Sequence, residues 1–144
     1  MFVTRAAFTV AAATAAGIAL GGAALAGETP SPEGAKLYFI TPQDGDTVSN
    51  PVHVVFGLSG MGVAPAGIEK EKTGHHHLII DADLPSMDEP IPADDNYRHF
   101  GGGQTEVVVE LAPGSHTLQL LLGDMNHIPH NPPVMSETIS ISVK

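Results

Sequence analysis

The sequence predicts an all-β protein, a single antiparallel immunoglobulin-like β-sandwich domain, and three observations lead to this prediction. Short runs rich in β-branched and aromatic residues alternate with turns that contain Gly and Pro. In several runs apolar residues occupy every second position, which is the period of a strand with one buried face. After residue 26 no segment shows the apolar period of a helix. Six to seven short strands without helices favour two packed sheets.

The first three predicted strands lie in the first half of the domain. Lys36–Thr41 is a β-rich run that ends at the turn sequence Pro42–Asp46. Val52–Leu58 follows, and its alternation places four apolar residues on one face: Val52, Val54, Phe56 and Leu58. His75–Asp81 is the third strand. It follows a long loop, residues 59–74.

The later strands show the alternation more clearly. Thr105–Leu111 presents Thr105, Val107, Val109 and Leu111 to one side. The turn Ala112–Ser115 leads into His116–Leu122, whose inward residues are Leu118, Leu120 and Leu122. The last strand, Thr138–Lys144, has the inward set Ile139, Ile141 and Val143. A second long loop, residues 82–104, is of a length that is usually functional or mobile.

The N-terminal segment reads as an export signal. Arg5 supplies a positive start, residues 6–20 are apolar and Ala-rich, and Ala24-Leu25-Ala26 has the small-x-small form of a cleavage site. We therefore divide the chain into a signal peptide (1–26), a flexible leader (27–35) and the β-sandwich domain (36–144). This division predicts a periplasmic or secreted protein that is not inserted in a membrane after cleavage.

Composition excludes several classes of function. The chain has no Cys, which rules out disulfides, a lipid anchor on an N-terminal Cys, blue-copper centres and iron–sulfur clusters. Its formal net charge is −10, and loss of Arg5 with the signal would make it −11. Such an acidic chain repels phosphate backbones, so nucleic acid is not an expected partner.

Histidine is the informative residue type. Seven of the eight His lie between His75 and His130, at strand starts or in loops. His75 and His77 share one face of a strand, with Cα atoms about 6.6 Å apart, and can lean onto one ion. His76 then points the other way, with a structural role. Six residues are the candidate metal ligands: His75, His77, His99, His116, His127 and His130.

Topology leaves two arrangements of these ligands open. If successive strands simply alternate in direction, His75, His77 and His116 lie at one end, and His99, His127 and His130 at the other, with Asp124 as a carboxylate neighbour. If the loop at residues 82–104 folds back or contains an extra strand, that parity changes. One merged site and two separate sites are both allowed.

Two functions from different classes follow. The first is a carrier, buffer or sensor of a transition metal, copper or zinc, because neutral imidazole suits these ions. Met61, Met125 and Met135 as soft ligands would favour copper. The second is an interaction module that docks a protein or glycan through its long loops. A periplasmic partner protein is compatible with either. We find no nucleophile motif or catalytic residue, and we expect no enzyme.

Four motifs carry a resemblance to a known family: "TGHHHLIID", "HFGGGQTEVVVEL", "PGSHTLQLLLGD" and "NHIPHNPPVMSETISI". In order and wording they resemble the domain-of-unknown-function 4399 family of exported bacterial proteins, from about residue 36 to residue 143. The resemblance implies a small periplasmic or extracellular β domain and brings no settled activity. The residues that match the family pattern are His75, His76, His77, His99, Gly101, Gln104, Thr105, Glu106, His116, Asp124, His127 and His130.

Overall fold

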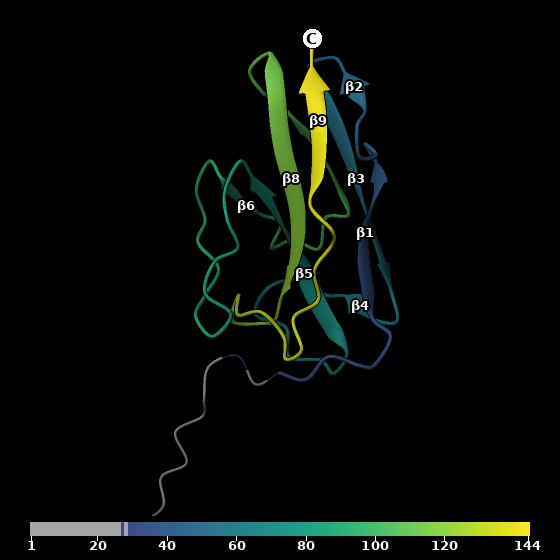
Figure 1. The fold of residues 1–144 in the computed structure, drawn as a ribbon. Coiled ribbons are helices and arrows are strands. Elements are labelled where there is room, and N and C mark those ends of the chain that lie inside the picture. The colour runs from purple at the N-terminus through teal and green to yellow at the C-terminus, as the bar shows by residue number, and fades with distance from the viewer. Residues whose placement is uncertain (1–26, 28) are drawn as a thin grey trace, which may run out of the picture.

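The computed structural model describes residue 27 and residues 29–144, so the predicted signal peptide lies outside the described residues. The described chain is built from β-strands joined by loops (Figure 1). The strands, in chain order, are β1 (Lys36–Thr41), β2 (Thr47–Val48), β3 (Val52–Ser59), β4 (Gly62–Val63), β5 (Thr73–Ile80), β6 (Tyr97–His99), β7 (Glu106–Val109), β8 (Gly114–Gly123) and β9 (Ile139–Val143).

The strands form two sheets. One sheet has the order β1-β3-β7, and its pairs are antiparallel. The other has the order β2-β9-β8-β5-β4, and β6 also pairs with β5, antiparallel, on the side away from β8. The long strand β8 pairs antiparallel with both β5 and β9 (Figure 1). Only the two-residue strands β2 and β4 pair in parallel among the described strands.

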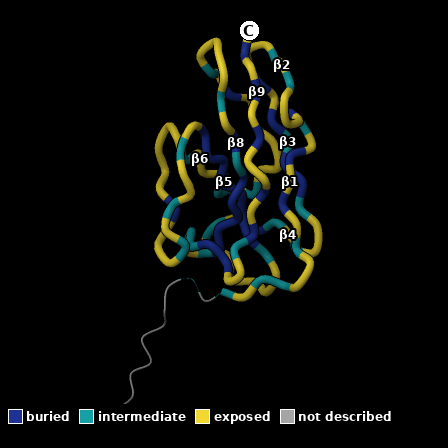
Figure 2. Tube along the Cα trace, viewed as in Figure 1, coloured by how far each residue is buried: buried dark blue, intermediate teal, exposed yellow. Residues whose placement is uncertain are grey.

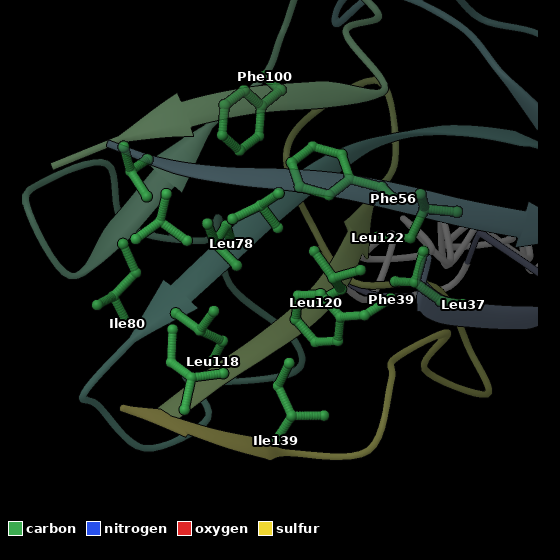
Figure 3. Packing of buried hydrophobic residues seen from close by; sticks show 14 of the residues in the cluster. Leu37, Phe39, Phe56, Leu78, Ile80, Phe100, Leu118, Leu120, Leu122 and Ile139 are labelled. Carbon is green, nitrogen blue, oxygen red and sulfur yellow. The ribbon is translucent and has the colours of Figure 1, made fainter. Parts of the chain in front are cut away.

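The hydrophobic core fills the space between the two sheets. Buried residues follow the middle of the fold, and the exposed residues lie mainly in the loops (Figure 2). Phe39 and Phe56 from the smaller sheet face leucines from β8 (Figure 3). Leu118, Leu120 and Leu122 are fully buried, and β9 adds Ile139 and Ile141. Alternate residues of the longer strands therefore make the main core between the sheets.

Loops cover the outer face of the larger sheet near β5. Ile79 of β5 and Leu121 of β8 point away from the main core and pack with Ile91 of the long loop. The amide of Ile91 donates a hydrogen bond to the carbonyl of His127 (2.8 Å), which joins this loop to the one that follows β8. Residues on the outer face of β5 are buried for this reason.

The structure confirms the prediction of a single all-β sandwich. All six predicted strands are present, and the inward residues of β8 and β9 are those that the alternation indicated. The short strands β2 and β4 were not predicted, because two residues are too few to show a period. Strand β6 is the extra strand that the sequence left open within residues 82–104. No helix in the described part of the chain is long and apolar enough to cross a membrane.

The leader is held against the domain, whereas the sequence predicted a flexible segment. Ser31 donates its amide to the carbonyl of Asn131 (3.2 Å), and Asn131 donates back to Thr29 (2.9 Å). The Ser31 hydroxyl donates to the carbonyl of Pro132 (2.7 Å). Backbone hydrogen bonds, together with the Ser31 hydroxyl, therefore hold this segment against the loop that contains Asn131.

Candidate metal site

Four imidazoles converge on the outer face of the larger sheet. His75, His77, His99 and His127 each offer a ring nitrogen, and these nitrogens lie within 4.8 Å of one another. Neighbouring ring centroids are 4.7–5.1 Å apart, and the widest pair, His77 and His127, is 6.3 Å apart. We call these four residues the histidine cluster.

Strand β5 supplies the two buried members of the cluster. Successive side chains of a strand point to opposite faces, so His75 and His77 share the outer face, as predicted. Their ring centroids are 4.8 Å apart, and each residue is 1% exposed. Both residues pair with residues of β8 in the sheet, which fixes their backbone. These two imidazoles are the rigid part of the cluster.

The short strand β6 brings in His99. Its three residues pair with β5, and His99 lies directly opposite His77, which places the two rings 5.1 Å apart. Gly101 leaves room for this ring, because a Cβ at that position would lie 2.7 Å from Nε2 of His99. His99 is exposed, so this side of the cluster faces solvent.

The loop after β8 supplies His127. Its backbone has φ +66°, a left-handed conformation that non-Gly residues rarely adopt. The amide of His127 donates to the carbonyl of Asp124 (3.0 Å), and the amide of Asp124 donates to the carbonyl of Ile128 (2.8 Å). This tight loop turns the His127 ring toward β5, where its Nδ1 lies 3.1 Å from Nε2 of His75.

The buried ring of His77 has unused binding capacity. Neither of its nitrogens has a hydrogen-bond partner within the described residues, and a buried polar atom left in this state costs about 1–3 kcal/mol. Gly123 accommodates the ring, since a Cβ there would lie 2.7 Å from Cε1 of His77. An ion bound by the lone pair of His77 would satisfy one of these nitrogens.

Burial and crowding favour the neutral form of three rings of the cluster. Desolvation, followed by the neighbouring rings of His99 and His127, lowers the pKa of His75 to about 4. Desolvation and the ring of His75 lower the pKa of His77 to about 3. The pKa of His99 is also lowered, by desolvation first and then by His127. At neutral pH these three rings therefore have a free lone pair, which is the form that binds metals.

The dimensions of the cluster suit a first-row transition ion. Zinc accepts four nitrogens at about 2.0–2.1 Å in a tetrahedron, which sets the nitrogens about 3.3 Å apart. The distance between His75 and His127, 3.1 Å, is already near this value. All the candidate nitrogens lie within 4.8 Å of one another. The donor set is four imidazoles.

Two of the six predicted ligands lie outside the cluster. His116 is near the start of β8, and its Nδ1 and Nε2 lie 2.6 Å from a carboxylate oxygen of Asp81 and 2.6 Å from the carbonyl of Ala112. His130 is buried and donates from Nε2 to the carbonyl of Thr73 (3.0 Å). Because β6 adds one strand between β5 and β8, β8 runs antiparallel to β5. The start of β8, with His116, therefore lies at the opposite end of β5 from His75, and not at the same end as simple alternation of the strands would give.

His76 points into the core, as predicted, where its ring lies 5.0 Å from that of Phe56. Neither of its nitrogens has a hydrogen-bond partner among the residues that the structure describes. Desolvation by burial lowers its pKa to about 4. It is a buried neutral ring rather than the hydrogen-bonded structural residue that we expected.

Two of the three methionines considered as soft ligands, Met61 and Met135, lie away from the cluster. Met61 packs against the hydrophobic core. Met135 is 43% exposed and forms an isolated β-bridge with Leu121, so β8 lies between it and β5.

The space that Gly101 and Gly123 leave for the histidine rings was not identified from the sequence. A Gly that ends a Leu-rich strand was the available signal for Gly123.

Comparison with known proteins agrees with the motif resemblance. Neither the curated proteins nor the solved structures include a significant match to the chain. A family model described as a domain of unknown function (DUF4399) matches residues 54–144, a span that includes all members of the histidine cluster. This match covers well over half of the chain, and the protein therefore belongs to the DUF4399 family.

Proposed function

We propose that the protein binds one divalent transition-metal ion through His75, His77, His99 and His127, as a carrier, buffer or sensor. The observation that supports this most strongly is the convergence of four imidazole nitrogens within 4.8 Å of one another, on residues from three separate segments. The low pKa values of His75 and His77, about 4 and about 3, keep these lone pairs free at neutral pH.

Binding rather than catalysis fits the donor set. Catalytic zinc sites commonly use three protein ligands and leave a position for water, whereas four protein ligands complete a tetrahedron. The exposed side of the cluster, at His99, gives an ion a path in and out. A filled coordination sphere with an accessible edge favours reversible uptake, so we propose that the protein is not an enzyme.

Copper is the ion we propose first, with zinc as the alternative. All-nitrogen sites bind first-row divalent ions with an affinity that peaks at Cu²⁺ and then falls at Zn²⁺. The donor set contains no thiolate, since the chain has no Cys, and imidazole suits both divalent ions.

We further propose that the protein acts outside the cytoplasm, in the periplasm or as a secreted chain. The N-terminal charge, apolar run and Ala24-Leu25-Ala26 site support this. A mature mass that begins at Gly27, measured on protein recovered from the periplasm or medium, is the expected result. An unprocessed chain in the cytoplasm would contradict it.

Titration of untagged protein with Cu²⁺ and Zn²⁺, in competition with a chelator of known affinity, tests the metal site. We expect one ion per chain. The His77→Ala variant removes a ligand that is held rigidly on β5, and its affinity should fall at least about a hundredfold, or 2.7 kcal/mol. Unfolding curves of the apo variants show whether the fold is retained.

The matched control is His53→Ala. His53 lies on β3, is exposed and pairs with Glu106 (2.7 Å), so its loss removes an imidazole far from the cluster. We expect unchanged metal affinity for this variant. Equal affinity of wild type and a folded His77→Ala variant, or no binding of either ion at micromolar concentration, would contradict the proposal.

A further inference from the structure

Asp124 organises the loop that delivers His127. Asp124 is buried, with only 3% of its surface exposed. Its Oδ1 accepts hydrogen bonds from the amides of Asn126 (2.8 Å) and Ile128 (3.0 Å), the residues that flank His127. The Asp124 carbonyl also accepts the amide of His127 (3.0 Å). One residue therefore fixes the backbone on both sides of a cluster member.

The second carboxylate oxygen of Asp124 is held from the leader. Its Oδ2 accepts the hydroxyl of Thr29 at 2.6 Å, a short bond of the kind made to a charged acceptor. All three hydrogen-bond partners of this carboxylate are donors. The loop thus holds a buried carboxylate in a fixed orientation.

This carboxylate lies beside the cluster. Its Oδ1 accepts the amides on both sides of His127, and Asp124 directly follows Gly123, where a Cβ would lie 2.7 Å from the His77 ring. Imidazoles bind a metal ion in their neutral form and contribute no charge. A cation held by the cluster would therefore have the Asp124 carboxylate as a neighbouring anion.

We propose that Asp124 is the positioning residue of the histidine cluster and makes it selective for a divalent ion over monovalent Cu⁺. The proposal rests on the metal-binding function above. Attraction between a carboxylate and an ion scales with the charge of the ion, so a dication gains twice as much as a monocation. Burial weakens the screening of this attraction by water and salt.

The variant that separates charge from structure is Asp124→Asn. An amide oxygen still accepts the two backbone amides, and the amide nitrogen can donate to the Thr29 hydroxyl, so the loop keeps its hydrogen bonds while the charge is lost. Asp124→Ala removes both. Glu110→Gln, at an exposed position after β7, removes an equal charge from the surface and is the matched control.

The experiment measures Zn²⁺ affinity by chelator competition, Cu⁺ affinity with a chromogenic Cu⁺ chelator under reductant, and the potential of the copper-loaded protein. In Asp124→Asn we expect Zn²⁺ affinity to fall about tenfold and Cu⁺ affinity to change far less. Tenfold weaker Cu²⁺ binding at constant Cu⁺ binding raises the potential by about 59 mV. Asp124→Ala should weaken both ions, and Glu110→Gln neither.

Equal losses for both ions in Asp124→Asn would show a purely structural role and overturn the selectivity. Unchanged affinities and potential would overturn any role of the charge. If the wild type itself binds neither ion, the metal-binding function fails first, and this outcome is separate from a failure of Asp124 alone.

Discussion

The two ends of the pairing between β5 and β8 place histidines in opposite situations. At one end, beside Gly123, imidazoles of the histidine cluster face one another, and His77 has no partner for either nitrogen among the described residues. At the other end, His116 is held between the carboxylate of Asp81 and the carbonyl of Ala112. Both nitrogens of His116 face acceptors, so its ring must donate from both.

This difference teaches how to distinguish a ligand from a structural histidine. Residue type and a place at a strand end are the same in the two regions. What differs is the protonation state that the neighbours require, since the cluster favours neutral rings and the His116 corner favours the cation. The neighbouring groups therefore decide which ring has a lone pair for an ion.

The largest expected effect is the acid sensitivity of the metal-free protein. His75, His76 and His77 have pKa values lowered to about 4, 4 and 3, below the unfolded value of 6.5. Groups with depressed pKa stabilise the fold above pH 6.5, and this contribution is lost as pH falls toward 4. Each ring contributes a slope of about 1.4 kcal/mol per pH unit in that window.

Urea unfolding in the presence of a chelator, at intervals from pH 7.5 to 4.5, measures this slope. The variant His76→Leu removes one buried titrating ring and no cluster member, so its slope should be shallower than that of the wild type. A free energy of unfolding that stays flat between pH 6.5 and 5 would mean that these rings are not buried as neutral groups.

A smaller effect is expected at Gly123, which adjoins the cluster without contributing a ligand. A Cβ at Gly123 would lie 2.7 Å from the His77 ring, so Gly123→Ala should displace that ring and lower metal affinity about tenfold or more. Gly62→Ala is the control, because a Cβ there meets Thr73 only at an ordinary 3.6 Å. Equal metal affinity of the two variants would show that His77 is not a metal ligand.

The smallest effect is expected at the His116 corner, with the opposite pH dependence. The hydrogen bond to Asp81, and then that to Ala112, raises the pKa of His116 above 6.5. Its stabilising contribution is present below pH 6.5 and is lost as pH rises through the raised value. We expect His116→Ala to cost about 1 kcal/mol at pH 6, since Asp81 is partly solvated, and less at pH 9.

His53→Ala again serves as the reference, because the exposed pair with Glu106 should contribute less than about 0.5 kcal/mol at any pH. Thermal unfolding at the two pH values compares the variants. If the loss of stability in His116→Ala grew with pH, the His116 ring would not be held as a cation. The contrast between this ring and the histidine cluster would then fail.

Local patterns predicted most of the fold. Leu118, Leu120 and Leu122 recur at every second position and face the main core, as the alternation indicated, although Leu121 on the opposite face is buried as well. The same period-2 rule placed His75 and His77 on one face and His76 on the other, because it depends on neither loops nor partners. These results follow from geometry within one strand.

The rest of the site depends on contacts between distant segments. His99 joins the cluster through β6, which is too short to produce an alternation in the sequence. His127 joins it through a left-handed turn that the buried Asp124 stabilises. His116 was predicted as a ligand but lies outside the cluster, because β6 reverses the direction of β8 relative to the predicted one. Pairing between distant strands decided the positions of His99 and His116, and the backbone conformation of one loop decided that of His127.

The fastening of the leader has a practical consequence for anyone who labels or immobilises this protein. Thr29 bonds to Asp124, so a fusion partner joined just ahead of it would pull on the loop that holds His127. The other terminus follows β9, whose Val143 pairs with Gly114 at the end of β8 far from Gly123, about 30 Å away at strand spacing (Figure 1). Handles and reporters therefore belong after Lys144.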